Sequence, residues 1–410
     1  MKRTMALFLS LLLLLLTACG GPSYQAEELK GAPSAVPAVP AEMDLNGAAD
    51  AVTDFAVELL RQTDTGGSTL LSPVSVVYAL AMTANGAAGE TLTQMESVLG
   101  LPLEELNACL RAYADQLPAE EVGRCSLANS IWLRDQADRL TVEQSFLDAA
   151  AAYYDASVFR APFDESTLRD INAWVSDHTG GLIPSIVEEI PESAVIYLIN
   201  ALAFEGEWED IYREDQVHDG TFTTEDGQEQ SAELMYGAES AYLEDDLASG
   251  FLKYYQGQNY AFAALLPNEG VSLDAYLSSL TGERLRDLLA HPQDTVVQTA
   301  IPKFTAETTT ELNDALSALG MADAFDVGLA DFSAMGASTD GPLYISRVLH
   351  KTHLTLDERG TRAGAATAVQ MAGSTADPLS VYLTRPFLYV LMDCEAGLPL
   401  FIGTVRDLGT

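Results

Sequence analysis

The stretch that most limits how this chain can fold lies near its middle, where residues 195–204 are apolar at every position except Asn200. A strand with apolar side chains in both parities must be covered on both faces, so we predict a central strand with a layer of structure on each side. A buried, unpaired asparagine amide would cost about 1–3 kcal/mol. We therefore expect Asn200 to have hydrogen-bond partners.

The remaining pattern divides into early helices and late strands. A helix should begin at Ser72, because its hydroxyl can cap free amides and Pro73 tolerates the first turn, where no N–H is needed. Helical spacing predicts further helices at 48–60, 166–176, 273–289 and 309–319. Strand-like runs occupy 260–266, 343–356, 381–391 and 400–405. This order indicates a mixed α+β fold and not a regular βαβ alternation.

The charge balance excludes one class of partner. The chain has 60 Asp and Glu residues against 21 Lys and Arg, a formal net charge of -39. Such a surface repels phosphate backbones, so we expect no nucleic-acid partner. The charge serves solubility or, alternatively, attracts a basic partner such as a cationic protease.

Sequence signatures of catalysis are missing. The chain has no GxSxG elbow, HExxH helix, Walker loop or GxGxxG turn. His350 and His353 form an HxxH pair, but in a strand their three-residue offset points them to opposite faces. We therefore predict that the protein is not an enzyme, with no catalytic residues, no metal site and no cofactor.

The N-terminus has the features of a secretory signal. Lys2 and Arg3 precede a short apolar run, 6–16, which is followed by Thr17-Ala18-Cys19-Gly20. This order resembles a bacterial lipobox, which implies a signal peptide at 1–18, cleavage before Cys19 and a lipid on that cysteine. The alternative is an ordinary signal peptide with an incidental cysteine. The lipid would hold the protein on the extracellular face of a bacterial membrane.

Composition separates a linker from one domain. Residues 20–43 are rich in Ala, Pro, Gly and Ser, so we interpret 19–44 as a lipidated cysteine with a flexible tether and 45–410 as a single domain. Three further cysteines remain, and a Cys109–Cys125 disulfide is an open alternative outside the cell.

The segment 354–375 is unlike the other strands. Leu354 and Leu356 alternate as in a strand, and from Gly360 onward the side chains become small. The residues of one parity are compact and uncharged, so that face can slot between existing strands, whereas Arg362 lies on the other parity and can stay in solvent. The alternative is an alanine-rich flexible loop or a helix.

This segment resembles the hinge of the reactive-centre loop of inhibitory serpins. The residues that match the hinge are Glu358, Arg359, Gly360, Thr361, Ala363, Gly364, Ala365, Ala366 and Thr367. Further blocks occur in the family's order at 72–75, 172–175, 200–208, 301–304, 331–333, 385–387 and 401–403. The resemblance thus covers the chain from about residue 48 to its C-terminus.

The resemblance implies a serpin fold with three β-sheets, about nine helices and an exposed reactive-centre loop at about 358–380. It also implies a serine protease inhibitor that acts as a suicide substrate. The protease cuts the loop and becomes covalently attached, and the freed hinge then inserts as a new strand, as serpins are known to do. The partner would be a serine protease or, alternatively, a cysteine protease, bound by a monomer.

The resemblance also assigns roles to single residues. The cleaved bond falls near Ser374-Thr375, with Met371 as a second bait position. Small side chains there favour elastase-like or subtilisin-like proteases. Residues that match the cluster governing the opening of the main sheet are Ser72, Ser75, Asn200 and His350. Residues that match the start of insertion are Trp208, Lys303 and Glu358, with Lys303 paired to Glu358.

Two other functions stay open. A non-inhibitory serpin that acts as a carrier or chaperone would share the fold, but such members often have bulky, charged or proline-bearing hinges. A secreted hydrolase would need a nucleophile that no motif marks. The small hinge residues favour the inhibitor.

Overall fold

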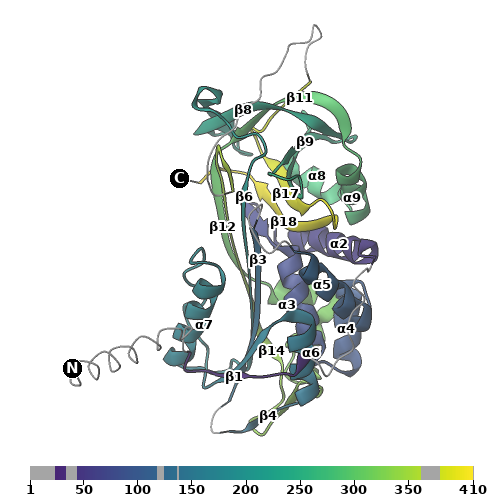
Figure 1. Ribbon diagram of the computed structural model, residues 1–410, viewed down its shortest axis with the longest axis vertical. Helices are drawn as coiled ribbons and strands as arrows, with labels where there is room; N and C mark the ends of the chain where they lie inside the picture. Colours follow the sequence, from purple (N-terminus) through teal and green to yellow (C-terminus); the bar gives the residue numbers. More distant parts are fainter. Residues whose placement is uncertain (1–23, 34–43, 118–123, 136–137, 362–378, 410) are drawn as a thin grey trace, which may run out of the picture.

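The computed structural model describes residues 24–33, 44–117, 124–135, 138–361 and 379–409. Within these ranges the chain forms nine α-helices and three β-sheets. The predicted α+β class, with three sheets and about nine helices, is confirmed. Figure 1 shows the largest helical cluster on one side of a long sheet and helix α7 (Glu165–His178) on the other side.

The long sheet has seven strands. Its order is β1 (Glu27–Leu29), β5 (Ser157–Ala161), β3 (Arg124–Arg134), β6 (Ile196–Glu207), β14 (Ile345–Leu356) and β12 (Phe304–Glu311), with β15 (Gly360–Thr361) also paired to β6. Strand β6 runs antiparallel to β3 and parallel to β14. The run around Asn200 is therefore a central strand, as predicted.

Strand β6 is covered on both faces because its two parities pack against different layers. Ile196 and Leu198 belong to the main core, which contains helix α3 (Pro73–Ala84), whereas Tyr197 and Ile199 pack with the inner face of α7. All twelve residues of α3 are buried, as expected for a helix without a polar face. The same side of the sheet carries α2 (Asn46–Thr63), α4 (Gly89–Leu99), α5 (Leu103–Gln116) and α6 (Gln144–Tyr154) (Figure 1).

The second sheet has nine strands. Its order is β16 (Leu379–Tyr382), β11 (Gln293–Pro302), β8 (Glu229–Glu244), β9 (Ala248–Tyr254), β10 (Tyr260–Pro267), β17 (Phe387–Asp393), β18 (Leu398–Val405) and β2 (Thr69–Leu71), with β7 (Val217–Thr223) on β8. Strands β10, β17 and β18 are buried at every residue. A third, two-stranded sheet pairs β4 (Leu140–Val142) with β13 (Gly336–Ser338).

The helix predicted at 309–319 is wrong only in its first part. Residues 309–311 belong to strand β12, and the helical part begins at α10 (Asn313–Leu316) and continues into the π-helical turn η3 (Ser317–Met321). The repeated threonines are β-branched and alternate in exposure along β12, so a period of two, and not the helical period, governs this stretch.

Two other predicted elements are each divided by a local break. The helix expected at 273–289 is α8 (Leu273–Ser279) followed by α9 (Gly282–Ala290), because Thr281 Oγ1 accepts a hydrogen bond from Arg284 N and starts a new helix. The strand expected at 381–391 is β16 and β17, separated by a turn that contains Pro386. Proline lacks the N–H that a continuous ladder requires.

The tether prediction is wrong for part of its length, since Glu27–Leu29 forms strand β1 along β5. Ala26 N donates to Asp170 Oδ2 at 2.7 Å, and Tyr24 Oη donates to Asp177 Oδ2 at 3.0 Å. An exposed strand edge offers unpaired backbone groups to any extended segment. Composition could not predict this pairing, because the strand depends on the edge of β5, which is distant in sequence.

Two further observations concern cysteines and membranes. Cys109, whose disulfide with Cys125 the sequence left open, is a free, buried thiol on α5 in this structure. Among the helices that the structure describes, none combines the length and the apolar character needed to cross a bilayer.

Candidate functional site

The candidate site lies where strand β6 loses its pairing with β14. Paired residues of these parallel strands run from Ile345↔Ile196 to Thr352↔Leu202. Beyond that point the chain turns back after β14, and Gly360 and Thr361 pair antiparallel with the end of β6. Strand β15 thus forms a two-residue antiparallel pairing with β6 beyond the end of the β6–β14 ladder.

The first residue of β15 must be glycine. Gly360 has φ of +136°, and a Cβ built there would lie 2.2 Å from the carbonyl oxygen of Gly206 on β6. No side chain fits that space, and L-residues rarely adopt such a φ.

The second residue of β15, Thr361, is fixed by a buried hydrogen bond. Thr361 is 2% exposed, and its hydroxyl hydrogen-bonds the hydroxyl of Tyr255 over 2.9 Å. The Tyr255 ring stacks on Trp208, with centroids 4.3 Å apart. Thr361 is thus buried, whereas the burial of the later residues of the same parity stays a prediction.

The turn before β15 is anchored by backbone carbonyls. Trp208 donates from Nε1 to the carbonyl of Asp357 at 3.0 Å and from its backbone N–H to that of Arg359 at 2.8 Å. The Tyr212 N–H donates to the Glu358 carbonyl, also at 2.8 Å. Three consecutive carbonyls at the root of the segment are thus fixed by one short stretch of chain.

The predicted ion pair beside this root is present. Lys303 Nζ lies 2.8 Å from Glu358 Oε2 and 3.4 Å from Glu233 Oε1. The Lys303 ammonium holds the pKa of the Glu358 carboxyl below its ordinary value. Both side chains are partly exposed, so the pair contributes only about 0–1 kcal/mol to the stability of the fold.

A second group of residues joins the two central strands from beneath. His350 on β14 stands opposite Asn200 on β6, and its Nδ1 lies 2.6 Å from Asn200 Oδ1. The backbone N–H of Ser72 lies 2.9 Å from His350 Nε2. A backbone N–H can only donate, so Nε2 is the bare nitrogen and Nδ1 carries the proton that bonds Asn200.

The histidine of this group is neutral. His350 is completely buried, and burial lowers its pKa from 6.5 to about 3. Protonation would also place an N–H on Nε2 against the N–H of Ser72. The neutral ring therefore bridges β14, β6 and Ser72 by hydrogen bonds. The role of this group in the opening of the sheet stays a prediction.

The cluster leaves several polar atoms unpaired. Among the described residues, Ser75 Oγ, Asn129 Oδ1 and Asn200 Nδ2 are buried without a hydrogen-bond partner. Asn200 thus has a partner for its oxygen, as expected, but none for its nitrogen. Each buried polar group that stays unpaired costs about 1–3 kcal/mol, so these atoms lower the stability of the closed arrangement.

Sequence reasoning missed several members of the site. Asn129 pairs in register with Asn200 from strand β3, and Tyr255 and Tyr212 reach the hinge from outside the matched motifs. Tyrosine and asparagine at these positions carry no distinguishing local pattern. Their roles follow from contacts between segments that are distant in sequence.

Several predicted site residues lie outside the described residues. They are Cys19, Arg362, Ala363, Gly364, Ala365, Ala366, Thr367, Met371, Ser374 and Thr375. The lipidation site, most of the hinge and the reactive bond therefore stay predictions.

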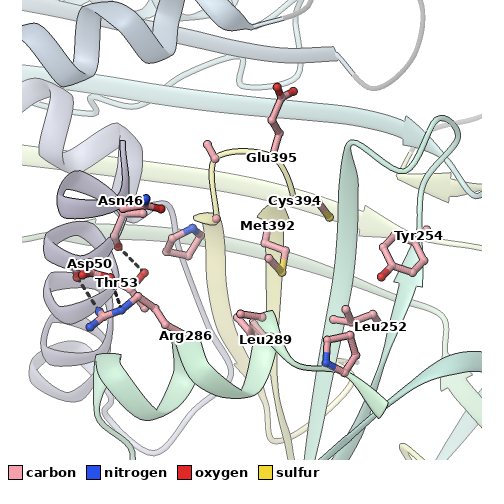
Figure 2. Close-up of a pocket in the computed structure, with 16 residues that line it drawn as sticks. Asn46, Asp50, Thr53, Leu252, Tyr254, Arg286, Leu289, Met392, Cys394 and Glu395 are labelled. Atoms are coloured by element: carbon pink, nitrogen blue, oxygen red, sulfur yellow. Dashed lines mark hydrogen bonds and ion pairs between the residues drawn. The ribbon is translucent and has the colours of Figure 1, made fainter. Parts of the chain in front are cut away.

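Away from the hinge, a cleft of about 430 Å³ opens between α2, α9, β9 and β17 (Figure 2). Its Arg286 is engaged by Asp50 at 2.6 Å. Burial raises the pKa of the Cys394 thiol to about 12, and no histidine lines the cleft beside it. The described lining thus contains no activated nucleophile, and no metal-binding cluster of His, Cys, Asp and Glu occurs in the described chain.

Comparison with known proteins decides the family. The family model described as "Serpin (serine protease inhibitor)" matches residues 50–408, most of the chain. This chain is a serpin. The matched span includes the hinge root, the cluster beneath the sheet, the nine-stranded sheet and every strand of the seven-stranded sheet except β1.

Individual serpins align over nearly their full length. The thermophilic serpin tengpin in its native state is 41% identical, with a TM-score of 0.88 over 94% of this chain and 100% of the solved one. The leukocyte elastase inhibitor of Bos taurus is 28% identical over 87% of this chain and 98% of its own length. The corticosteroid-binding globulin of Oryctolagus cuniculus is 30% identical, over 88% and 95%.

Gly360→Ala tests whether the hinge root needs glycine. We expect the variant to lose about 1–3 kcal/mol of unfolding free energy, because both the backbone and the Gly206 carbonyl oppose a Cβ. Urea unfolding measures the loss. The matched control is Gly341→Ala, since Gly341 has φ of +140° but open space around its Cβ. Equal losses in both variants would show that the close approach to Gly206 is unimportant.

Acid should destabilise this serpin through His350. The folded pKa of about 3 lies below the unfolded value of 6.5, so the contribution of His350 is fully present above pH 6.5 and is lost as the pH falls toward 3. One such group changes the unfolding free energy by about 1.4 kcal/mol per pH unit.

Urea unfolding across this pH interval measures the dependence. His350→Gln should flatten it relative to wild type, whereas His353→Gln, on the same strand but outside the cluster, should leave it unchanged. An equally steep loss in wild type and His350→Gln would contradict the assigned role.

Proposed function

We propose that this serpin inhibits a serine protease as a suicide substrate, by cleavage of the reactive segment and insertion of its hinge into the seven-stranded sheet. The observation that carries the proposal is strand β15, which already pairs with the end of β6 where the ladder to β14 stops. After Arg362, whose parity can face solvent, residues 363–369 are small and uncharged. Continued pairing of this segment would therefore bury no bulky or charged side chain on the inserting face.

The proposed target is an elastase-like or subtilisin-like serine protease. The proposed bond, Ser374-Thr375, is flanked by small side chains that suit shallow specificity pockets. The similarity to the bovine leukocyte elastase inhibitor is consistent with this class. A cysteine protease is the alternative target.

The rival functions have less support. Corticosteroid-binding globulin is named for a carried steroid, and thyroxine-binding globulin, solved with thyroxine, is 21% identical to this chain and shares the fold. The compact, uncharged side chains on the Thr361 parity of the hinge favour an inhibitor over such a carrier. The described cleft beside Cys394 gives a hydrolase no nucleophile.

Incubation of the soluble domain with an elastase-like protease tests the function. We expect an SDS-stable adduct, together with cleaved inhibitor that resists heat better than the intact protein, because insertion adds a paired strand. Cleavage without an adduct or a gain in heat resistance would support the non-inhibitory serpin. Turnover of a generic ester or peptide substrate would support the hydrolase.

Thr361→Arg is the sharpest variant for this assay. The position is buried, so an arginine would have to be buried unpaired, at a cost of several kcal/mol. The adduct should disappear while cleavage persists. Thr361→Ser, which keeps the hydroxyl that contacts Tyr255, is the control and should still form the adduct. An unchanged adduct yield in Thr361→Arg would refute the assigned hinge.

We also propose that the protein is a lipoprotein, anchored through Cys19 to the extracellular face of a bacterial membrane. The support is the lipobox-like Leu16-Thr17-Ala18-Cys19-Gly20 after an apolar run. In a bacterial host, labelled fatty acid should be incorporated into wild type and not into Cys19→Ser. If Cys19→Ser still incorporated the label, Cys19 would not be the lipidated residue and the proposal would be wrong.

A further inference from the structure

A buried charge pair lies directly behind the root of the reactive segment. Lys253, on strand β9, is 2% exposed, and its Nζ lies 2.9 Å from Glu239 Oε1 on β8. The same ammonium donates to the carbonyl of Asp210 at 3.1 Å. Neither charge has a part in the cleavage or insertion described above.

The ammonium is also surrounded by two aromatic rings. Lys253 Nζ lies 4.5 Å from the ring centroid of Tyr212 and 5.3 Å from that of Trp208. A desolvated cation attracts the faces of such rings strongly. The Glu239 carboxylate keeps the lysine charged at this depth, so the attraction on both rings depends on the pair.

These two aromatic residues are the ones that hold the hinge root. Trp208 binds the carbonyls of Asp357 and Arg359, and Tyr212 binds that of Glu358. Tyr255 lies two residues after Lys253, directly after the end of β9. Its ring stacks on Trp208, and its hydroxyl hydrogen-bonds Thr361. Lys253 and Tyr255 therefore hold the same indole, one through charge and one through stacking.

We propose that Lys253 and Glu239 are positioning residues for loop insertion, which hold Trp208 and Tyr212 and thereby fix the point where the inserting strand starts. This inference rests on the proposed inhibitory function. The pair touches neither the protease nor the described part of the inserting strand. It acts through the two aromatic side chains.

Loss of the lysine charge should change how the cleaved inhibitor partitions. Insertion of the segment into the sheet competes with hydrolysis of the acyl-enzyme. If the hinge root is held less firmly, insertion is slower, and a larger share of the acyl-enzyme is hydrolysed. We expect Lys253→Met to raise the ratio of cleaved inhibitor to adduct by about tenfold, equivalent to about 1.4 kcal/mol in the competing barriers. The rate at which the protease cuts the loop should stay the same.

Hydrogen exchange measured by mass spectrometry gives a readout that needs no inhibition. In Lys253→Met the peptides that contain the Trp208 and Tyr212 amides should exchange faster than in wild type, because both amides bond the hinge carbonyls. Lys253→Arg keeps the charge and should restore most of the protection. Glu239→Gln removes only the carboxylate charge, so exchange of the two amides should be faster than in wild type and slower than in Lys253→Met. This variant keeps the test available if Lys253→Met fails to fold.

The matched control is Arg406→Met. The Arg406 side chain is as buried as that of Lys253, but its ion pairs are with Asp64, Glu225 and Asp274. A purely structural role for Lys253 would make both variants loosen the molecule alike. The inference predicts faster exchange at Trp208 and Tyr212 in the Lys253 variant alone.

The outcomes separate this inference from the proposed function. Unchanged exchange at the two amides in Lys253→Met and Glu239→Gln, or the same change in Arg406→Met, would overturn the positioning role. A wild-type protein that never forms an adduct would overturn the inhibitory function. In that case the exchange comparison would still decide whether the pair positions the hinge root.

Discussion

The rest of the structure depends on the parallel pairing of β6 with β14 in the middle of the seven-stranded sheet. Parallel ladders are slightly weaker per residue than antiparallel ones. A strand entering between β6 and β14 would replace one parallel ladder with two antiparallel ladders. The neutral His350 is bonded to Asn200 across this pairing, and the turned-back β15 pairs with β6 at the end where the ladder to β14 stops.

Local pattern predicted the parts of the fold that local forces determine. The two-sided apolar run produced β6, and Ser72 with Pro73 produced the start of α3, since burial parity and capping act within a few residues. The Lys303–Glu358 contact and the His350 cluster were expected from the family resemblance, and their atoms do meet. What these contacts do in insertion stays a prediction.

Other features could not be predicted because they depend on contacts between distant segments. The stretch 309–319 has helical spacing, yet its first residues are drawn into β12 by pairing with β14. Strand β1 forms because β5 offers an unpaired edge. Lys253 has no distinguishing pattern in the sequence. Only the folded chain brings Glu239, Tyr212 and Trp208 around it.

Strand β1 also has a consequence for self-association. Under the proposed mechanism the sheet accepts an extra strand, and such a sheet is at risk of accepting one from another molecule. On one rim, β1 covers part of β5, and on the other rim β12 presents Glu307, Thr309 and Glu311 to solvent, which discourages edge-to-edge contact. Preparations that trim the chain to its helical start at Asn46 would uncover the β5 rim and should be more prone to aggregate than the chain that retains residues 24–33.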